Sequence, residues 1–77
     1  MAKKLTVRYD KIGDILYIDT CTPYADQDSE ELGDEIIARL NQISSAVENL
    51  EILFFSKRWD TLNLLELPIN AVLQLAS

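Results

Sequence analysis

The chain has 77 residues, of which 13 are acidic and 7 are basic, so its net charge is −6. A protein that binds nucleic acid needs a basic surface to hold phosphates, and this composition argues against DNA or RNA as a partner. No run approaches the roughly 18 apolar residues of a membrane span, and residues 1–8 are basic without the apolar core of a signal peptide. The single cysteine cannot form an internal disulfide. We expect a cytoplasmic protein with neither a nucleic-acid nor a membrane partner.

The small size of the chain favours association with a second copy. A single domain of 8.8 kDa buries roughly 8,000 Å² on folding, about 60% of it apolar, which contributes ~120 kcal/mol at ~25 cal/mol/Å². Ordering the chain at ~1.5 kcal/mol per residue costs ~115 kcal/mol. These terms nearly cancel, so apolar surface covered by another subunit would add useful stability. We expect a homo-oligomer, and two-fold dimers are the commonest kind.

Residues 5–19 are predicted to form a β-hairpin, because apolar and polar side chains alternate before the turn and β-forming residues follow it. In the turn, Asp10 can accept a hydrogen bond from a backbone N–H two residues on, and Gly13 is expected to take a positive φ. One register pairs Tyr9 with Ile15, and a register slipped by one residue stays open.

The next segments predict two further strands. Residues 20–35 hold six acids and no base, which indicates a solvated connection. Residues 35–41 alternate in polarity and form the third strand, and residues 47–55 form the fourth, which is apolar on both faces and therefore central. The predicted fold class is α+β: a four-stranded antiparallel β-meander over residues 5–58, in one domain spanning 1–77.

The remaining segment, 59–77, has apolar residues at helical spacings of three and four, interrupted at Pro68. We predict a C-terminal helix from about Pro68 to Ala76, packed on one face of the sheet and burying Ile69, Val72 and Leu73. Residues 60–66 fit either a helix or a short strand.

The chain has no histidine, so the usual general base and a common metal ligand are missing. We assign no catalytic, cofactor-binding or metal residue, and we expect a protein without a cofactor. Three polar features remain: a carboxylate pair flanking the first turn, one acid inside the apolar strand, and a Ser-Lys-Arg sequence suited to binding an anion or capping a helix. The candidates for ligand binding or for a structural polar cluster are Asp10, Asp14, Glu51, Ser56, Lys57 and Arg58.

The acid within the apolar strand, Glu51, requires a basic partner, because an unpaired buried carboxylate is costly. Arg8, Arg39 and Arg58 are the candidate partners. Large apolar side chains around the end of that strand and after it are candidates for an interface with another protein. They are Phe54, Phe55, Trp59, Leu62, Leu64 and Leu65.

Two sequence blocks together resemble the small bacterial family known as domain of unknown function 2283. The first is Tyr-Asp-Lys-Ile-Gly-Asp-Ile-Leu-Tyr-Ile at 9–18, and the second is Leu-Glu-Ile-Leu-Phe-Phe-Ser-Lys-Arg at 50–58. The chain departs from the family pattern at Asn49, where the family has glycine, and at 44–45, where two serines replace an Asp-Gly-like turn. The resemblance extends over residues 5–58 and implies no established activity. It does imply an antitoxin or partner-binding role, because family members often lie beside genes for toxin-like proteins.

Three functions follow from these observations. The first is a non-catalytic, homo-oligomeric protein-interaction module. The second is a small-molecule or anion-binding protein, or a weak enzyme, that uses Glu51, Ser56 and Arg58. The third is an antitoxin-like partner of a neighbouring toxin, bound partly through the acidic residues 26–35.

Overall fold

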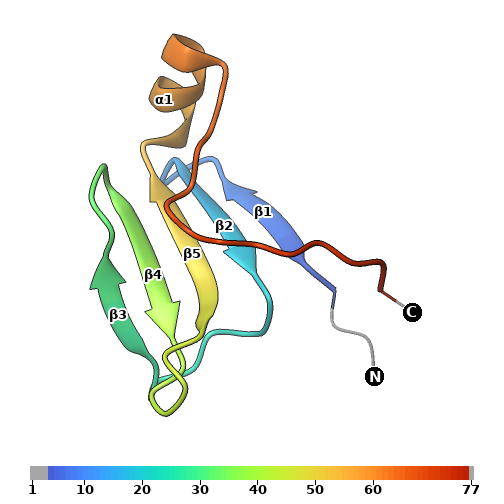
Figure 1. Cartoon of the computed structure of the whole chain (residues 1–77). Coiled ribbons are helices and arrows are strands. Elements are labelled where there is room, and N and C mark those ends of the chain that lie inside the picture. Colours follow the sequence, from blue (N-terminus) through green and yellow to red (C-terminus); the bar gives the residue numbers. More distant parts are fainter. Residues whose placement is uncertain (1–3, 77) are drawn as a thin grey trace.

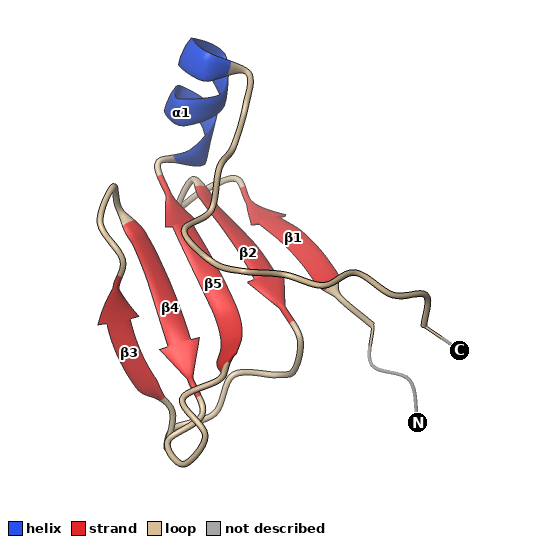
Figure 2. Ribbon diagram, viewed as in Figure 1, coloured by secondary structure: helices blue, strands red, loops and turns tan. Residues whose placement is uncertain are grey.

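The computed structural model describes residues 4–76 and contains one antiparallel sheet and one helix (Figures 1 and 2). The elements are β1 (Thr6–Asp10), β2 (Ile15–Asp19), β3 (Asp28–Glu31), β4 (Ile36–Leu40), β5 (Val47–Leu53) and α1 (Phe55–Leu62). The α+β class is therefore confirmed. Within residues 4–76, no helix is both long and apolar enough to cross a membrane.

The sheet has five strands in the order β1-β2-β5-β4-β3, so the prediction of a four-stranded meander is wrong. The apolar strand β5 takes the centre, between β2 and β4, where both of its edges are hydrogen-bonded. The additional strand, β3, comes from the acidic segment. It forms at the edge of the sheet, where its backbone pairs with β4 while all four side chains stay exposed to solvent.

The first hairpin adopts the slipped register. Val7 pairs with Ile18 and Tyr9 pairs with Leu16, so all four side chains lie on the same face of the sheet. This register places Val7 and Tyr9 on the face of Leu16 and Ile18, which pack against the core, whereas pairing Tyr9 with Ile15 would have placed them on the face of Ile15 and Tyr17.

The turn of this hairpin differs in one respect from the prediction. Asp10 accepts a hydrogen bond from the N–H of Ile12 at 3.0 Å, as expected. The positive φ belongs to Asp14 (56°) and not to Gly13. A Cβ at position 13 would lie 2.8 Å from a carboxylate oxygen of Asp10, so a larger residue there would displace that carboxylate.

The two faces of the sheet differ in what lies over them. One, the covered face, carries the core residues Ile36, Ala38, Leu50 and Ile52, which are fully or almost fully buried. Segment 63–76 begins after α1 and runs across this face (Figure 1), and its Leu65, Leu67 and Ile69 pack against the core. The opposite or open face carries Tyr17, Asp19, Arg39, Asn49 and Glu51, as the strand registers require.

The predicted strand over 47–55 ends two residues early, because Phe54 turns the chain with a left-handed backbone (φ 53°) and α1 begins at Phe55. The predicted helix from about Pro68 is wrong: residues 64–76 contain no helix or strand. Ile69 packs against the core, whereas Val72 and Leu73 are 86% and 87% exposed.

The packing of segment 63–76 explains this outcome. The side chains that contact the core lie two residues apart, at positions 65, 67 and 69, which is the spacing of extended chain and not of a helix. A nine-residue helix has little stability of its own, so packing in an extended conformation is preferred.

Candidate functional site

The six polar residues selected from the sequence lie in separate places. Ser56 meets Asp14 at the start of α1. Asp10 stays within its own turn, and Glu51 lies on the open face beside Arg39. Arg58 Nη2 donates to the backbone carbonyl of Asp34. The remaining residue of the set is Lys57, which follows Ser56 on α1.

Asp14 caps the N-terminus of α1 from the turn of the first hairpin. Its backbone carbonyl accepts a hydrogen bond from the N–H of Phe55 at 3.1 Å. One carboxylate oxygen accepts the N–H of Ser56 at 2.9 Å, and the other accepts the Ser56 hydroxyl at 2.7 Å. A carboxylate is favoured here because the first N–H groups of a helix lack partners within the helix and carry partial positive charge. The expectation that Ser56 itself caps the helix is therefore corrected.

The same carboxylate also binds the Tyr9 hydroxyl, which donates to Asp14 Oδ1 at 2.7 Å. This hydrogen bond raises the pKa of Tyr9 above its ordinary value, because ionisation would remove the donor. The hydrogen bonds from Tyr9 and then Ser56 lower the pKa of Asp14, because they stabilise the carboxylate. The cluster links β1, the hairpin turn and α1.

Aromatic contacts support the same junction. The ring of Phe55 lies 5.7 Å from that of Tyr9 in an edge-on arrangement and 5.8 Å from that of Trp59 in a stacked one. Both separations fall in the favourable range for aromatic pairs. The start of α1 is thus fixed to β1 by apolar as well as polar contacts.

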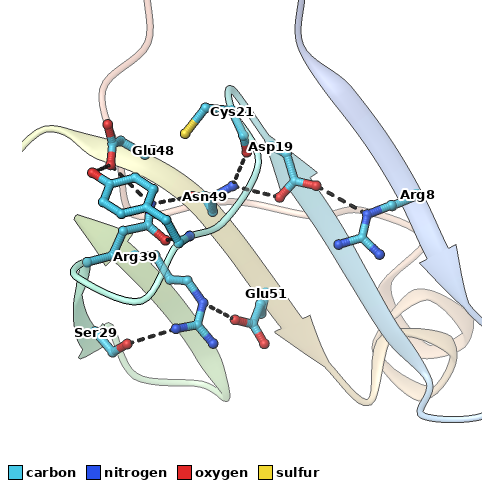
Figure 3. A network of polar contacts seen from close by, with 10 residues as sticks. Arg8, Asp19, Cys21, Ser29, Arg39, Glu48, Asn49 and Glu51 are labelled. Carbon is cyan, nitrogen blue, oxygen red and sulfur yellow. Dashed lines mark hydrogen bonds and ion pairs between the residues drawn. The ribbon is translucent and has the colours of Figure 1, made fainter. Parts of the chain in front are cut away.

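A second polar network, centred on Asn49, occupies one end of the open face (Figure 3). Asn49 is only 2% exposed, and its amide nitrogen donates to Asp19 at 2.9 Å and to the carbonyl of Cys21 at 2.7 Å. Its amide oxygen accepts a hydrogen bond from Gln27 at 2.7 Å. Asp19 also pairs with Arg8 Nε at 3.2 Å. Asn49 therefore joins β5, β2 and the loop after β2.

Glu48 extends this network along the same loop. Its carboxylate accepts hydrogen bonds from Gln27 Nε2 at 3.0 Å and from the Tyr24 hydroxyl at 2.6 Å. The hydrogen bond to Glu48 raises the pKa of Tyr24. These contacts hold the loop at 20–27 against the end of the sheet.

Sequence reasoning did not select Asn49 for this role. The available signal was its position, since a polar residue just before an apolar run in a central strand needs hydrogen-bonding partners when it is buried. The partners themselves come from positions 19, 21 and 27, at least 22 residues away in the sequence.

Glu51 does have a basic partner, as predicted. Of the three candidate arginines, Arg39 is the one that pairs with it, at 2.7 Å between Nε and the carboxylate. Arg39 Nη1 also donates to Ser29 at 3.2 Å, so this group spans β5, β4 and β3 (Figure 3). Its position indicates that it stabilises the pairing of those strands.

Two cavities adjoin these elements. One, of about 410 Å³, lies beside the Arg8–Asp19 ion pair and is also lined by Cys21. The other, of about 680 Å³, lies between α1 and the loop before β4, and its lining includes Lys57 and Arg58. The buried Nε of Arg58 has no hydrogen-bond partner among the residues that the structure describes. Within residues 4–76, no group of three Cys, Asp or Glu side chains could hold a metal ion.

The candidate interface residues divide between the core and the surface. Phe55 and Leu65 are half-buried and pack against the core. Phe54, Trp59 and Leu64 are exposed. The side chain of Leu62 lies outside the described part of the chain.

No family model, curated protein or solved structure matches this chain. The polar clusters therefore have to be interpreted from their own geometry. Asp14 fixes α1, Asn49 fixes the loop after β2, and Glu51 with Arg39 joins the central strands.

Proposed function

We propose that this chain is a non-catalytic protein-interaction module that assembles with copies of itself, most simply as a dimer. The observation that carries the proposal is the apolar surface that the last part of segment 63–76 itself exposes. Beyond Ile69, three large apolar side chains stand almost entirely in solvent: Val72, Leu73 and Leu75 are 86%, 87% and 98% exposed. Side chains of this kind stay in water only at a free-energy cost, which a partner surface would remove.

The total exposed area is consistent with a missing partner. The chain exposes 6120 Å², compared with roughly 4,800 Å² expected for a compact monomer of this mass. The excess of roughly 1,300 Å² exceeds the ~800 Å² that each partner contributes to a standard interface. Segment 63–76 contributes to this excess, because an extended chain has solvent on most sides.

The polar clusters give the proposal indirect support. Asp14, Asn49 and Glu51 each bind groups of the same chain that fix one element against another. Structural hydrogen bonding accounts for their presence without a reaction.

We also propose membership in the domain of unknown function 2283 family. Its support is that Tyr9 and Asp14, from the first block of the resemblance, meet Ser56 from the second in one hydrogen-bonded cluster. A shared structural role would explain why these residue types recur at these positions.

Sedimentation velocity over a range of micromolar concentrations tests the assembly. We expect a species of twice the monomer mass that dissociates on dilution. A monomer throughout this range would overturn the proposal, because the uncovered apolar surface would then have no partner of its own kind.

A second candidate function is anion binding at α1. Lys57 and Arg58 both line the cavity of about 680 Å³, and the buried Arg58 Nε lacks a hydrogen-bond acceptor. Glu51 and Ser56, which the sequence grouped with Arg58, are instead bonded to Arg39 and Asp14. Titration with inorganic phosphate, followed by amide chemical shifts, tests this function. Saturable shifts in α1 that disappear in Arg58→Gln would support it, and their absence in the unmodified chain would exclude it.

A further inference from the structure

Among residues 4–76, no strand pairs with the outer edge of β1, and the hydrogen-bond pattern identifies the backbone groups on that edge. Thr20 N–H donates to the carbonyl of Glu48 at 2.9 Å, so even-numbered residues of β2 direct their backbone groups toward β5. Odd-numbered residues of β2 then face β1. Because Tyr17 pairs with Arg8, the even-numbered residues of β1 face β2. The N–H and C=O groups of Leu5, Val7 and Tyr9 therefore point away from the sheet.

The side chains of these same residues lie on the covered face and are only partly sheltered. Leu5, Val7 and Tyr9 are 57%, 58% and 43% exposed. An edge strand with free backbone groups and an apolar row of side chains is a template for another strand.

The other edge of the sheet has the opposite character. Three of the four residues of β3 are acidic, namely Asp28, Glu30 and Glu31, and all four are exposed. Two such edges would repel each other if they were brought together. Self-association through strand pairing is therefore directed to β1.

We propose that a second copy of the chain pairs with β1 in antiparallel orientation, about a two-fold axis at Val7, to form one continuous ten-stranded sheet. This inference rests on the proposed function and names the surface that performs it. Val7 would face Val7 of the second copy, and Leu5 would face its Tyr9, so the covered faces of the two sheets join. The outward N–H and C=O groups of these residues would then pair with each other.

Charge complementarity selects this register. With the axis at Val7, Lys4 of each copy faces Asp10 of the other, which places opposite charges across the junction twice. Moving the axis to Arg8 would place Arg8 opposite Arg8 of the second copy, and moving it to Thr6 would place Arg8 opposite Lys4. Like charges in directly facing positions are unfavourable, so the axis at Val7 is preferred.

Segment 63–76 is placed to extend the same interface. In Figure 1 its last residues run toward the start of β1 and beyond it. The second copy would lie on that side, with its covered face continuous with that of the first. The exposed side chains of Val72, Leu73 and Leu75 would then contact the partner sheet. The two-fold axis puts the two segments at opposite ends of the joined strands, so they do not collide.

Proline at position 7 tests the pairing without breaking the first hairpin. The N–H of Val7 points outward, so Val7→Pro removes a donor from the proposed interface and none from the β1–β2 ladder. We expect the dimer dissociation constant to rise by about thirtyfold or more, since two inter-chain hydrogen bonds are lost. Val7→Thr, which keeps the N–H and the branched shape, is the matched control and should dimerise nearly as well as the unmodified chain.

A cross-link provides a second test that does not depend on the fold of the proline variant. Cys21 is first replaced by serine to remove the native thiol. In that background, Val7→Cys should form an inter-chain disulfide on mild oxidation, because directly facing residues of an antiparallel pair have Cα atoms about 5.5 Å apart, within disulfide range. Glu30→Cys on β3 is the control and should stay monomeric on a non-reducing gel.

The outcomes separate this inference from the proposed function. A dimer that cross-links at position 7 and is weakened by Val7→Pro supports both. A dimer that neither cross-links there nor responds to proline overturns the β1 interface and leaves self-assembly standing. A chain that sediments only as a monomer overturns both.

Discussion

Replacing Asn49 by alanine tests whether its buried hydrogen-bond network on the open face stabilises the fold. The substitution removes two hydrogen bonds donated by the Asn49 amide, one to the Asp19 carboxylate and one to the Cys21 carbonyl, and the bond accepted from Gln27. A neutral hydrogen bond contributes about 1 kcal/mol to stability, and a hydrogen bond to a charged group contributes about 1.5–3 kcal/mol. Water can replace only part of the bonding that the partners of Asn49 lose. We expect a loss of roughly 2–4 kcal/mol in the free energy of unfolding.

For a domain of this size, each kcal/mol lowers the melting temperature by about 4–8 °C, so a decrease of roughly 10–30 °C is expected. Urea denaturation followed by far-UV circular dichroism measures the change directly. Measurements at several protein concentrations separate it from any effect of assembly. The matched control is Asn70→Ala, an exposed asparagine after the core-packing residues, which should change stability by less than about 0.5 kcal/mol. If Asn49→Ala behaves like the control, the buried network does not hold the loop, and the reasoning is refuted.

Three further predictions concern the other two polar clusters. The pKa of Asp14 is lowered on folding, so its contribution to stability is complete above its ordinary value of 3.8 and is lost as pH falls through the folded value. Asp14→Asn should therefore lower the urea midpoint at pH 7. The difference in midpoint between the variant and the unmodified chain should shrink below pH 3.8, and a difference that stays constant with pH would contradict this prediction. The pKa of Tyr9 is raised, so its contribution to stability is lost only as pH rises above the ordinary value of 10.0. Tyr9→Phe should therefore reduce the loss of stability at alkaline pH, and the contribution of Tyr24 should remain. For the Arg39–Glu51 pair, a double-mutant cycle with Arg39→Gln and Glu51→Gln should give a coupling free energy of about 0.5–1 kcal/mol that weakens in high salt. Additive effects of the two substitutions on stability would mean that the contact is not maintained in solution.

Much of the sheet could be predicted because strands leave local patterns in the sequence. The first hairpin, the strand at 36–40 and the central strand each show alternation or an apolar run that survives in the structure. The need of Glu51 for a basic partner was also predictable from its place in an apolar strand. Which arginine provides it depends on the pairing of β4 with β5, which puts Arg39 on the same face as Glu51.

The errors arise where long-range pairing overrides local pattern. The residues of β3 are acidic or small and have low strand propensity. The strand forms because its backbone pairs with β4. In segment 63–76, apolar residues occur at both helical and extended spacings, and the core selects the extended set at 65, 67 and 69. Asp14 and Ser56 were both selected as candidates, but their bond spans 42 positions and depends on β2 lying beside β5.

The most direct test of the account is sedimentation equilibrium of the unmodified chain beside Val7→Pro and Val7→Thr. We predict a reversible dimer for the unmodified chain and for Val7→Thr. Val7→Pro should be monomeric at the same concentrations, with an unchanged circular dichroism spectrum. A folded, monomeric unmodified chain at all micromolar concentrations would contradict the central claim that a second copy covers the apolar surface beside β1.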